Sequence, residues 1–373
     1  MESTFESYIK KYIHKRYGKN SDQLLSQSYI LQYLVHKTKS ANKGAKARGS
    51  FANLYAIYVI VEDYLNNHFD IRNDYSTYDG AQFSVLFKRQ RELPFGAKLQ
   101  NHALNSRMNE EFFKFFPTQI GVPPIMRNLK TQRYWFNENY LKIQVGDKTY
   151  NIAKDIINII NHYIKVKQGT FKQFIEQCET LQSMDTADVS EVTGFIMSLL
   201  APNVDARLFE IVSYSILKLY YKDIEIYWGY TPEIEKLTKD FLHLYKTGRT
   251  NANDGGIDFV MRPLGRFFQV TETLDFKKYF LDIDKIERFP LSFVIKSEES
   301  VDDLLSKLKN DALKTYVVQK VVDDYLNCIE EIINIPQLKS YLSELESKNL
   351  IPDILKEIIL QSKVEFNYED EED

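Results

Sequence analysis

The hydrophobic pattern of the chain changes near residue 190, and this change constrains the fold more than any other feature. Before it, apolar residues recur at helical spacing in three segments, 1–35, 51–65 and 151–183. After it, short apolar or alternating segments are typical of strands, at 224–230, 257–261, 266–273 and 291–297. Helical patterns surround them at 205–222 and 300–365. The order helix, three strands, helix and strand predicts an α/β core in the second half.

These patterns divide the chain into three predicted regions. The first, 1–190, is mainly helical, and the second, 191–300, is an α/β (α+β) core with a mixed central sheet flanked by helices. The third, 301–373, is helical and ends in five acidic residues that we expect to be solvated. Within these regions we also expect a strand-like start at 83–86, a hairpin turn at Gly146-Asp147 and a charged helical insertion at 232–246.

The net charge of −4, taken alone, argues against a nucleic-acid partner, because such proteins usually carry excess Lys and Arg. The charge is, however, unevenly distributed. Residues 1–150 hold 22 Lys and Arg against 13 Asp and Glu, whereas residues 151–373 hold 26 against 39. The basic half could contact phosphates, and the acidic half could bind a cation. No apolar leader and no apolar run of membrane-spanning length occurs, so we expect a soluble, cytoplasmic (bacterial) protein with no membrane partner.

Polar residues interrupt two consecutive apolar strands. Asp258 and Gln269 each stand between two apolar residues, where an unpaired polar group has a burial cost. Residues two apart on a strand share a face, so Gln269 and Thr271 can face the same way beside Asp258. Glu210 on the preceding helix could approach the same point. Carboxylate and amide oxygens suit Mg²⁺, which keeps several waters. The alternative is that Glu210 is an ordinary helix acid and that Gly255-Gly256 is only a turn.

The residues Glu210, DGGID at 254–258 and QVT at 269–271 together resemble the PD-(D/E)XK nuclease superfamily. They are most similar to its Mrr-like branch of restriction endonucleases, which carries a helical Glu, then GGID and QxK on the two strands of a hairpin. The resemblance covers about residues 200–297. It implies a nuclease core that hydrolyses DNA with Mg²⁺, or with Mn²⁺ as a substitute. It also implies that Asp258 and Gln269 bind the metal and that Glu210 is a supporting acid.

The chain departs from the family pattern at one position, because Thr271 stands where the family has Lys. That Lys positions or activates the attacking water and offsets phosphate charge. Lys277 or Lys278 just beyond the strand, or Lys296 on the next strand, could replace it, and the Thr271 hydroxyl could hold the water. A catalytically inactive relative is a further alternative, as is a solvated position for each of the two loop lysines.

Three basic segments of the first region are candidates for binding DNA, since cations contact phosphates and Arg, Asn and Gln can pair with base edges. The first segment carries Lys37, Lys39, Lys43, Lys46 and Arg48. The second is predicted to be a polar loop with Lys88, Arg89, Arg91, Lys98, Gln100, Asn101, His102, Asn105, Arg107 and Asn109. The third includes Arg127, Lys130 and Arg133. The alternative for each is a solvated surface segment.

The sequence therefore predicts a sequence-specific type II restriction endonuclease acting on double-stranded DNA, with the 1–190 region carrying recognition. Two-fold symmetric DNA sites favour a homodimer. A nucleotide cofactor is not expected, because the chain lacks a G-x-x-x-x-G-K-[ST] motif. The competing hypotheses are a modification-dependent endonuclease, a non-cleaving DNA-binding protein on a degenerate nuclease scaffold, and an RNA nuclease or helical interaction protein.

Overall fold

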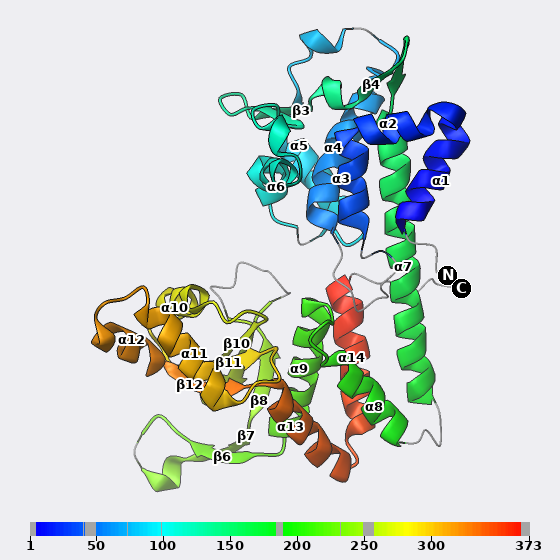
Figure 1. Cartoon of the computed structure of the whole chain (residues 1–373). Coiled ribbons are helices and arrows are strands. Elements are labelled where there is room, and N and C mark those ends of the chain that lie inside the picture. Colours follow the sequence, from blue (N-terminus) through cyan, green and yellow to red (C-terminus); the bar gives the residue numbers. More distant parts are fainter. Residues whose placement is uncertain are drawn as a thin grey trace. The chain divides into compact units, whose positions relative to one another are not determined.

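The computed structural model describes residues 5–39, 41, 50–72, 74–97, 99–183, 189–231, 233–248 and 257–366. The chain forms two compact units, Met1–Phe174 and Ile175–Asp373. The boundary falls within the long helix α7 (Ala153–Ser183) (Figure 1). Among the described residues, no helix is both long enough and apolar enough to cross a membrane.

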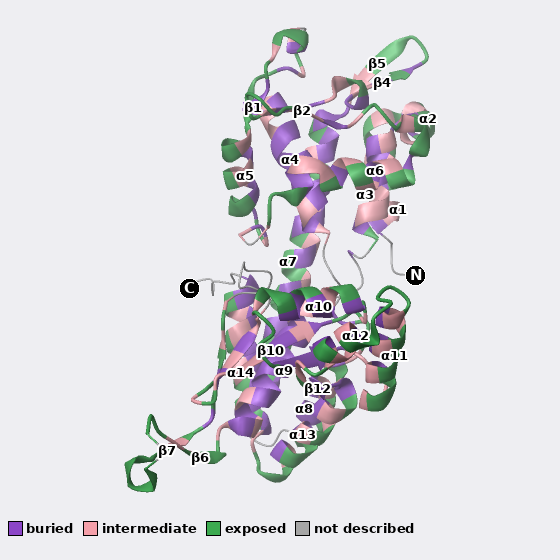
Figure 2. Ribbon diagram, turned by 90° about the vertical axis from the view of Figure 1, so that its left-hand side faces the viewer, coloured by how far each residue is buried: buried purple, intermediate pink, exposed green. Residues whose placement is uncertain are grey.

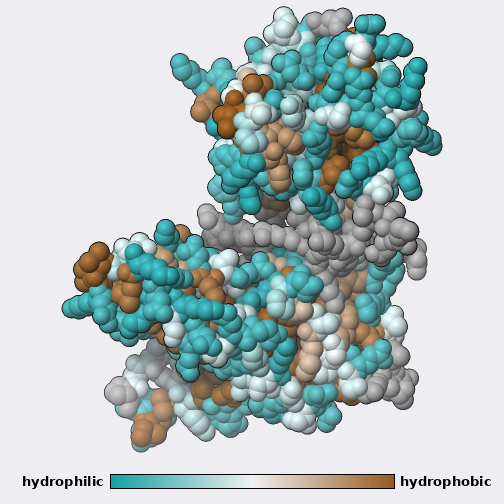
Figure 3. Space-filling view, viewed as in Figure 1, coloured by the Kyte–Doolittle hydropathy of each residue, from teal (hydrophilic) through white to brown (hydrophobic). Residues whose placement is uncertain are grey.

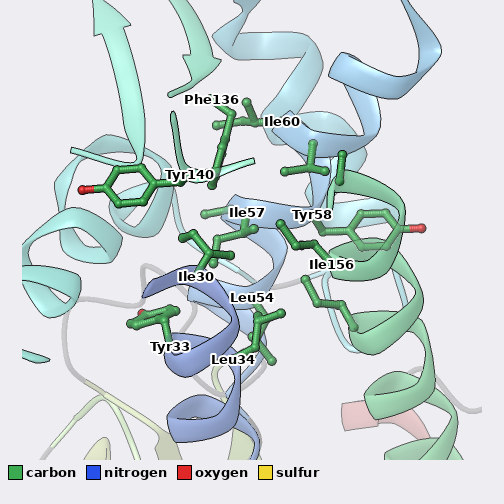
Figure 4. Close-up of a cluster of buried hydrophobic side chains, with 14 of the residues drawn as sticks. Ile30, Tyr33, Leu34, Leu54, Ile57, Tyr58, Ile60, Phe136, Tyr140 and Ile156 are labelled. Carbon is green, nitrogen blue, oxygen red and sulfur yellow. The ribbon is translucent and has the colours of Figure 1, made fainter. Parts of the chain in front are cut away.

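The N-terminal unit is mainly helical, as its sequence predicts. Its other helices are α1 (Phe5–Tyr17), α2 (Ser21–Gln27), α3 (Tyr29–Thr38), α4 (Phe51–Asn66), α5 (Phe83–Glu92) and α6 (Met108–Phe115). The strongly apolar α4 is buried along most of its length and forms the centre of the core. Figure 4 shows Leu54, Ile57 and Ile60 of α4 among Ile30 of α3 and Ile156 of α7. The buried helix predicted at 51–65 is therefore confirmed.

Two small antiparallel sheets complete this unit. One contains β1 (Ala81–Gln82), β3 (Arg133–Phe136) and β2 (Ile125–Asn128) in that order. The other is the hairpin of β4 (Lys142–Val145) and β5 (Lys148–Asn151), which turns at Gly146-Asp147 as predicted, with Gly146 at a φ of 60°. The strand predicted to start at Phe83 is wrong: pairing ends at Gln82, and α5 begins at the next residue.

The C-terminal unit contains a mixed five-stranded sheet in the order β12-β11-β10-β9-β8. Its first three strands form an antiparallel meander, β8 (His243–Lys246), β9 (Phe259–Arg262) and β10 (Arg266–Thr271). The helix α10 (Phe276–Lys285) leads to β11 (Leu291–Ile295), which runs parallel to β10. The strand β12 (Ile329–Ile333) adds parallel to β11. The predicted α/β class with a mixed sheet is confirmed.

Helices pack on both faces of this sheet. On one face α9 (Ala206–Tyr221) lies against the meander: the Tyr214 ring is 5.2 Å from that of Phe259, and its hydroxyl donates to the Leu244 carbonyl at 3.2 Å. Behind α9 pack α8 (Val189–Leu199), α13 (Ile335–Ser347) and α14 (Ile351–Phe366). On the other face α10, α11 (Val301–Leu313) and α12 (Gln319–Leu326) bury Phe293 of β11. Figure 2 marks the buried residues along these helices and strands.

Two predictions in this unit are wrong. The helical insertion predicted at 232–246 contains β7 (Thr238–Phe241) and β8 instead, because Leu242 and Leu244 are buried while their neighbours are exposed. The strand predicted at 224–230 is confirmed as β6 (Glu225–Trp228), but among the described residues it pairs with β7 and not with the central sheet. This hairpin exposes apolar surface, including Ile234 at 78% (Figure 3). The C-terminal segment, predicted to be helical throughout, contributes β12 to the central sheet.

Candidate functional site

The start of the β9–β10 hairpin holds the predicted acid and amide side by side. Asp258 directly precedes β9, and its N–H donates to the Phe268 carbonyl at 2.9 Å. Its carboxylate Oδ2 accepts the N–H of Val270 at 2.7 Å. These two bonds lie on either side of Gln269 in the sequence of β10, so Asp258 lies across from Gln269. The structure thus brings these two predicted residues together.

The Gln269 side chain has a buried oxygen that accepts no hydrogen bond from the described residues. Only 8% of the residue is exposed, and its Oε1 is buried with no hydrogen-bond partner in the described part of the chain. Its Nε2 donates to the Val270 carbonyl at 3.2 Å. A buried acceptor without a partner costs about 1–3 kcal/mol. A hard cation bound by this oxygen and the Asp258 carboxylate would offset that cost, so the donor chemistry fits Mg²⁺.

Thr271, the position where the resemblance leads one to expect Lys, lies close to a lysine. Thr271 is buried, and its Oγ1 accepts a hydrogen bond from Lys278 Nζ at 3.2 Å. The helix α10 achieves this because Asp275 caps its N-terminus, accepting the Lys277 N–H at 3.1 Å, which directs Lys278 back toward β10. Lys277 is exposed, with its Nζ 6.0 Å from the Phe276 ring. Both lysines lie on α10 and not in a loop, and of the two it is Lys278 that contacts Thr271.

Lys296, the third candidate, is bound elsewhere. Its buried ammonium lies 2.6 Å from Glu272 Oε1 and also contacts the Val204 carbonyl. Because Glu272 follows Thr271 directly, alternation directs the two side chains to opposite faces of the strand. In the described part of the chain, the Lys296 side chain makes no hydrogen bond to Thr271.

Glu210 is held by a residue that the sequence did not single out. It is 4% exposed on α9, and its Oε1 is 2.8 Å from Nζ of Lys246 on β8. The Phe268 ring lies 6.4 Å from that of Tyr221 on α9, so Phe268 faces α9. Gln269 is the next residue on the strand and therefore points to the opposite face of the sheet, away from the helix that carries Glu210. Among the described residues, no group of three His, Cys, Asp or Glu is placed to hold a metal. The sequence signal for Lys246 was the alternation of apolar and polar residues at 242–246, which is typical of a strand. The charged composition of the segment favoured a helix instead, so Lys246 was not considered.

Several predicted DNA-binding residues already have partners within the N-terminal unit. Lys37 Nζ lies 2.7 Å from Glu111, and Arg89 forms two 2.8 Å bonds with Glu62. The predicted loop containing Arg89 is wrong, because residues up to Glu92 form α5. Arg91 donates to the Ala97 carbonyl, Arg133 to that of Gly80 and Arg127 to that of Asn105. The amides of Asn105 and Asn109 accept from Tyr134 and Ile125, respectively, so both stabilise the fold.

The other described candidates are exposed: Lys39, Lys88, Gln100, Asn101, His102, Arg107 and Lys130. Arg91 and Arg127 are exposed as well, despite their bonds to backbone carbonyls. Four of these cations lie on α5 and the β2–β3 hairpin, which are neighbours because the Phe83 N–H donates to the Gln132 carbonyl at 2.9 Å. We call this set the basic surface: Lys88, Arg91, Arg127 and Lys130. The predicted DNA contacts at Lys43, Lys46, Arg48 and Lys98, and the glycines Gly255-Gly256 of the predicted motif, lie outside the described residues.

Comparison of this chain with protein families, curated proteins and solved structures finds no match.

Proposed function

We propose that this chain is a sequence-specific type II restriction endonuclease that hydrolyses phosphodiester bonds of double-stranded DNA with Mg²⁺. The observation that carries the proposal is the pair of Asp258 and Gln269, held across neighbouring strands with the buried Gln269 oxygen unpartnered. The order of α9, a three-stranded meander, α10 and a parallel strand supports it. This is the order that the resemblance to PD-(D/E)XK nucleases implies.

The proposed roles follow from the contacts of each residue. Asp258 and Gln269 would hold Mg²⁺, which when bound supplies positive charge beside the phosphate and lowers the pKa of a bound water. The Val270 N–H fixes one oxygen of Asp258, so the carboxylate is oriented in advance. Lys278, held at Thr271 Oγ1, would offset the negative charge that develops on the phosphate. Glu210 would act from a distance, by fixing β8 to α9 through Lys246.

Incubation of the purified chain with supercoiled plasmid tests this function. We expect discrete linear fragments with Mg²⁺ or Mn²⁺, no cleavage with a chelator, and a chain that is a homodimer by light scattering. Fragments from methylated plasmid alone would favour the modification-dependent endonuclease. Salt-sensitive binding to duplex DNA without cleavage would favour the non-cleaving protein. Absence of duplex binding would contradict the proposal.

Lys278→Met is expected to lower the cleavage rate by about 100-fold, because one charge that stabilises the transition state is removed. Met keeps the apolar stem, so the packing of α10 should persist. Lys277→Met is the matched control, since Lys277 is exposed one residue earlier, and we expect it to cleave at nearly the wild-type rate. Single-turnover cleavage of one plasmid measures both variants. Equal rates for the two would contradict the assignment of Lys278.

Lys88→Ala and Lys130→Ala are each expected to weaken DNA binding and to reduce the slope of log K against log salt by about one. The reason is that each exposed cation of the basic surface would release about one counterion from a phosphate. Lys15→Ala is the control, because this exposed lysine lies on α1, which Figures 1 and 2 place apart from α5. Fluorescence anisotropy of a labelled duplex over a salt series gives the slopes. Unchanged slopes in both variants would exclude this surface.

A further inference from the structure

A second polar site lies within the N-terminal unit, far along the sequence from Asp258. The helices α1 and α7, together with Leu93 and Pro94 just after α5, line an open pocket of about 540 Å³. Pockets of roughly 300–1,000 Å³ hold small ligands. The chemistry of its walls comes from Tyr8, Asn158, Asn161, His162, Lys165 and Gln168.

One wall of the pocket is aromatic. The rings of Tyr8 and His162 stack with centroids 3.7 Å apart and an interplanar angle of 21°. The Phe5 ring also stacks on His162, with the two ring centroids 5.6 Å apart. Burial and the charge of Lys165 lower the pKa of His162 below its ordinary value, which favours the neutral imidazole. A flat, uncharged aromatic wall favours a planar heteroaromatic ligand.

The rest of the lining from α7 carries amides and one positive charge. Asn158, Asn161, Lys165 and Gln168 follow one another at intervals of three and four residues, so they share one face of α7. No carboxylate is among the residues that line the pocket, and α7 has no acid between Asp155 and Glu176. Solvated helix faces usually mix both signs of charge. Amides that donate and accept, together with one ammonium, match a polar ring that bears an anionic group.

We propose that this pocket binds a nucleotide. The base packs against the Tyr8–His162 wall, the amides of Asn161 and Gln168 contact its polar edge, and Lys165 binds the phosphate. A free mononucleotide and a nucleotide within an unpaired DNA strand share this chemistry, and the test below separates them. The proposal stands whether or not the chain cleaves DNA.

Isothermal titration calorimetry of the full chain tests this site with the four common nucleoside monophosphates, adenosine and an eight-residue single-stranded DNA. We expect one site per chain for a mononucleotide or for the oligonucleotide. Lys165→Gln should weaken that binding about tenfold, because a charge-assisted contact to phosphate is lost, and it should leave the binding of adenosine unchanged. Gln168→Glu, which replaces an amide proposed to contact the base with a carboxylate that repels an anionic ligand, should weaken it too.

Lys114→Gln is the matched control, since Lys114 is an exposed lysine on α6 that does not line the pocket. All three substitutions lie at exposed positions, so thermal unfolding should match the wild type. Binding of a mononucleotide identifies a free ligand, and binding of the oligonucleotide alone identifies a DNA strand. If neither ligand binds saturably, or if Lys165→Gln and Lys114→Gln bind equally well, the proposal is wrong.

Discussion

Asp258→Asn is expected to reduce plasmid cleavage by about a thousandfold while leaving the fold intact. The Asn side chain keeps an oxygen that can accept the Val270 N–H, so the start of the β9–β10 hairpin should be preserved. The substitution removes the negative charge, however, and a neutral amide is a poorer ligand for a hard cation. With Gln269 as the other proposed ligand, the site would then lack any carboxylate on this hairpin.

Gel analysis of supercoiled plasmid cleavage over a Mg²⁺ series measures this effect. Asp302→Asn provides the control, because Asp302 is an exposed acid in the first turn of α11. Thermal unfolding of both variants separates a chemical defect from a folding defect. Equal cleavage by the wild type and Asp258→Asn would remove Asp258 from the proposed site, whereas a folded, inactive Asp258→Asn beside an active Asp302→Asn supports it.

The adjacency of Asp258 and Gln269 was predictable because it depends on local rules. Two apolar strands separated by a short turn form a hairpin, and the alternation of side chains then determines which residues share a face. Both rules use only neighbouring residues, so one sequence is enough. The hairpin at Gly146-Asp147 was predictable for the same reason, since a two-residue turn joins paired strands.

Features that depend on distant partners could not be read from the sequence. Arg89 and Lys37 are basic residues in polar segments, and nothing local indicates that Glu62 and Glu111 pair with them. Likewise, Lys277 and Lys278 differ by one position, and only the start of α10 at its Asp275 cap decides which one reaches Thr271. Tertiary pairing also overrides the charged composition of 232–246, which was predicted to be helical.

Lys246→Met is expected to destabilise the C-terminal unit by about 3–5 kcal/mol, because removing one member of a buried ion pair leaves the other charge without its partner. The Lys246 side chain is 12% exposed and that of Glu210 is 6% exposed, so water cannot readily solvate the remaining carboxylate. Urea unfolding followed by circular dichroism measures the change. Lys314→Met, which breaks an exposed pair with Asp311, should leave stability nearly unchanged.

The double variant Glu210→Gln/Lys246→Met identifies the cause of this loss. Replacing the carboxylate with a neutral amide removes the buried charge, so the double variant should recover most of the stability that Lys246→Met loses. Recovery of stability together with retained cleavage would mean that the pair fixes β8 against α9 and takes no part in the chemistry. Recovery of stability without cleavage would instead make Glu210 part of the reacting site. A double variant as unstable as Lys246→Met would contradict the buried ion pair as the source of the loss.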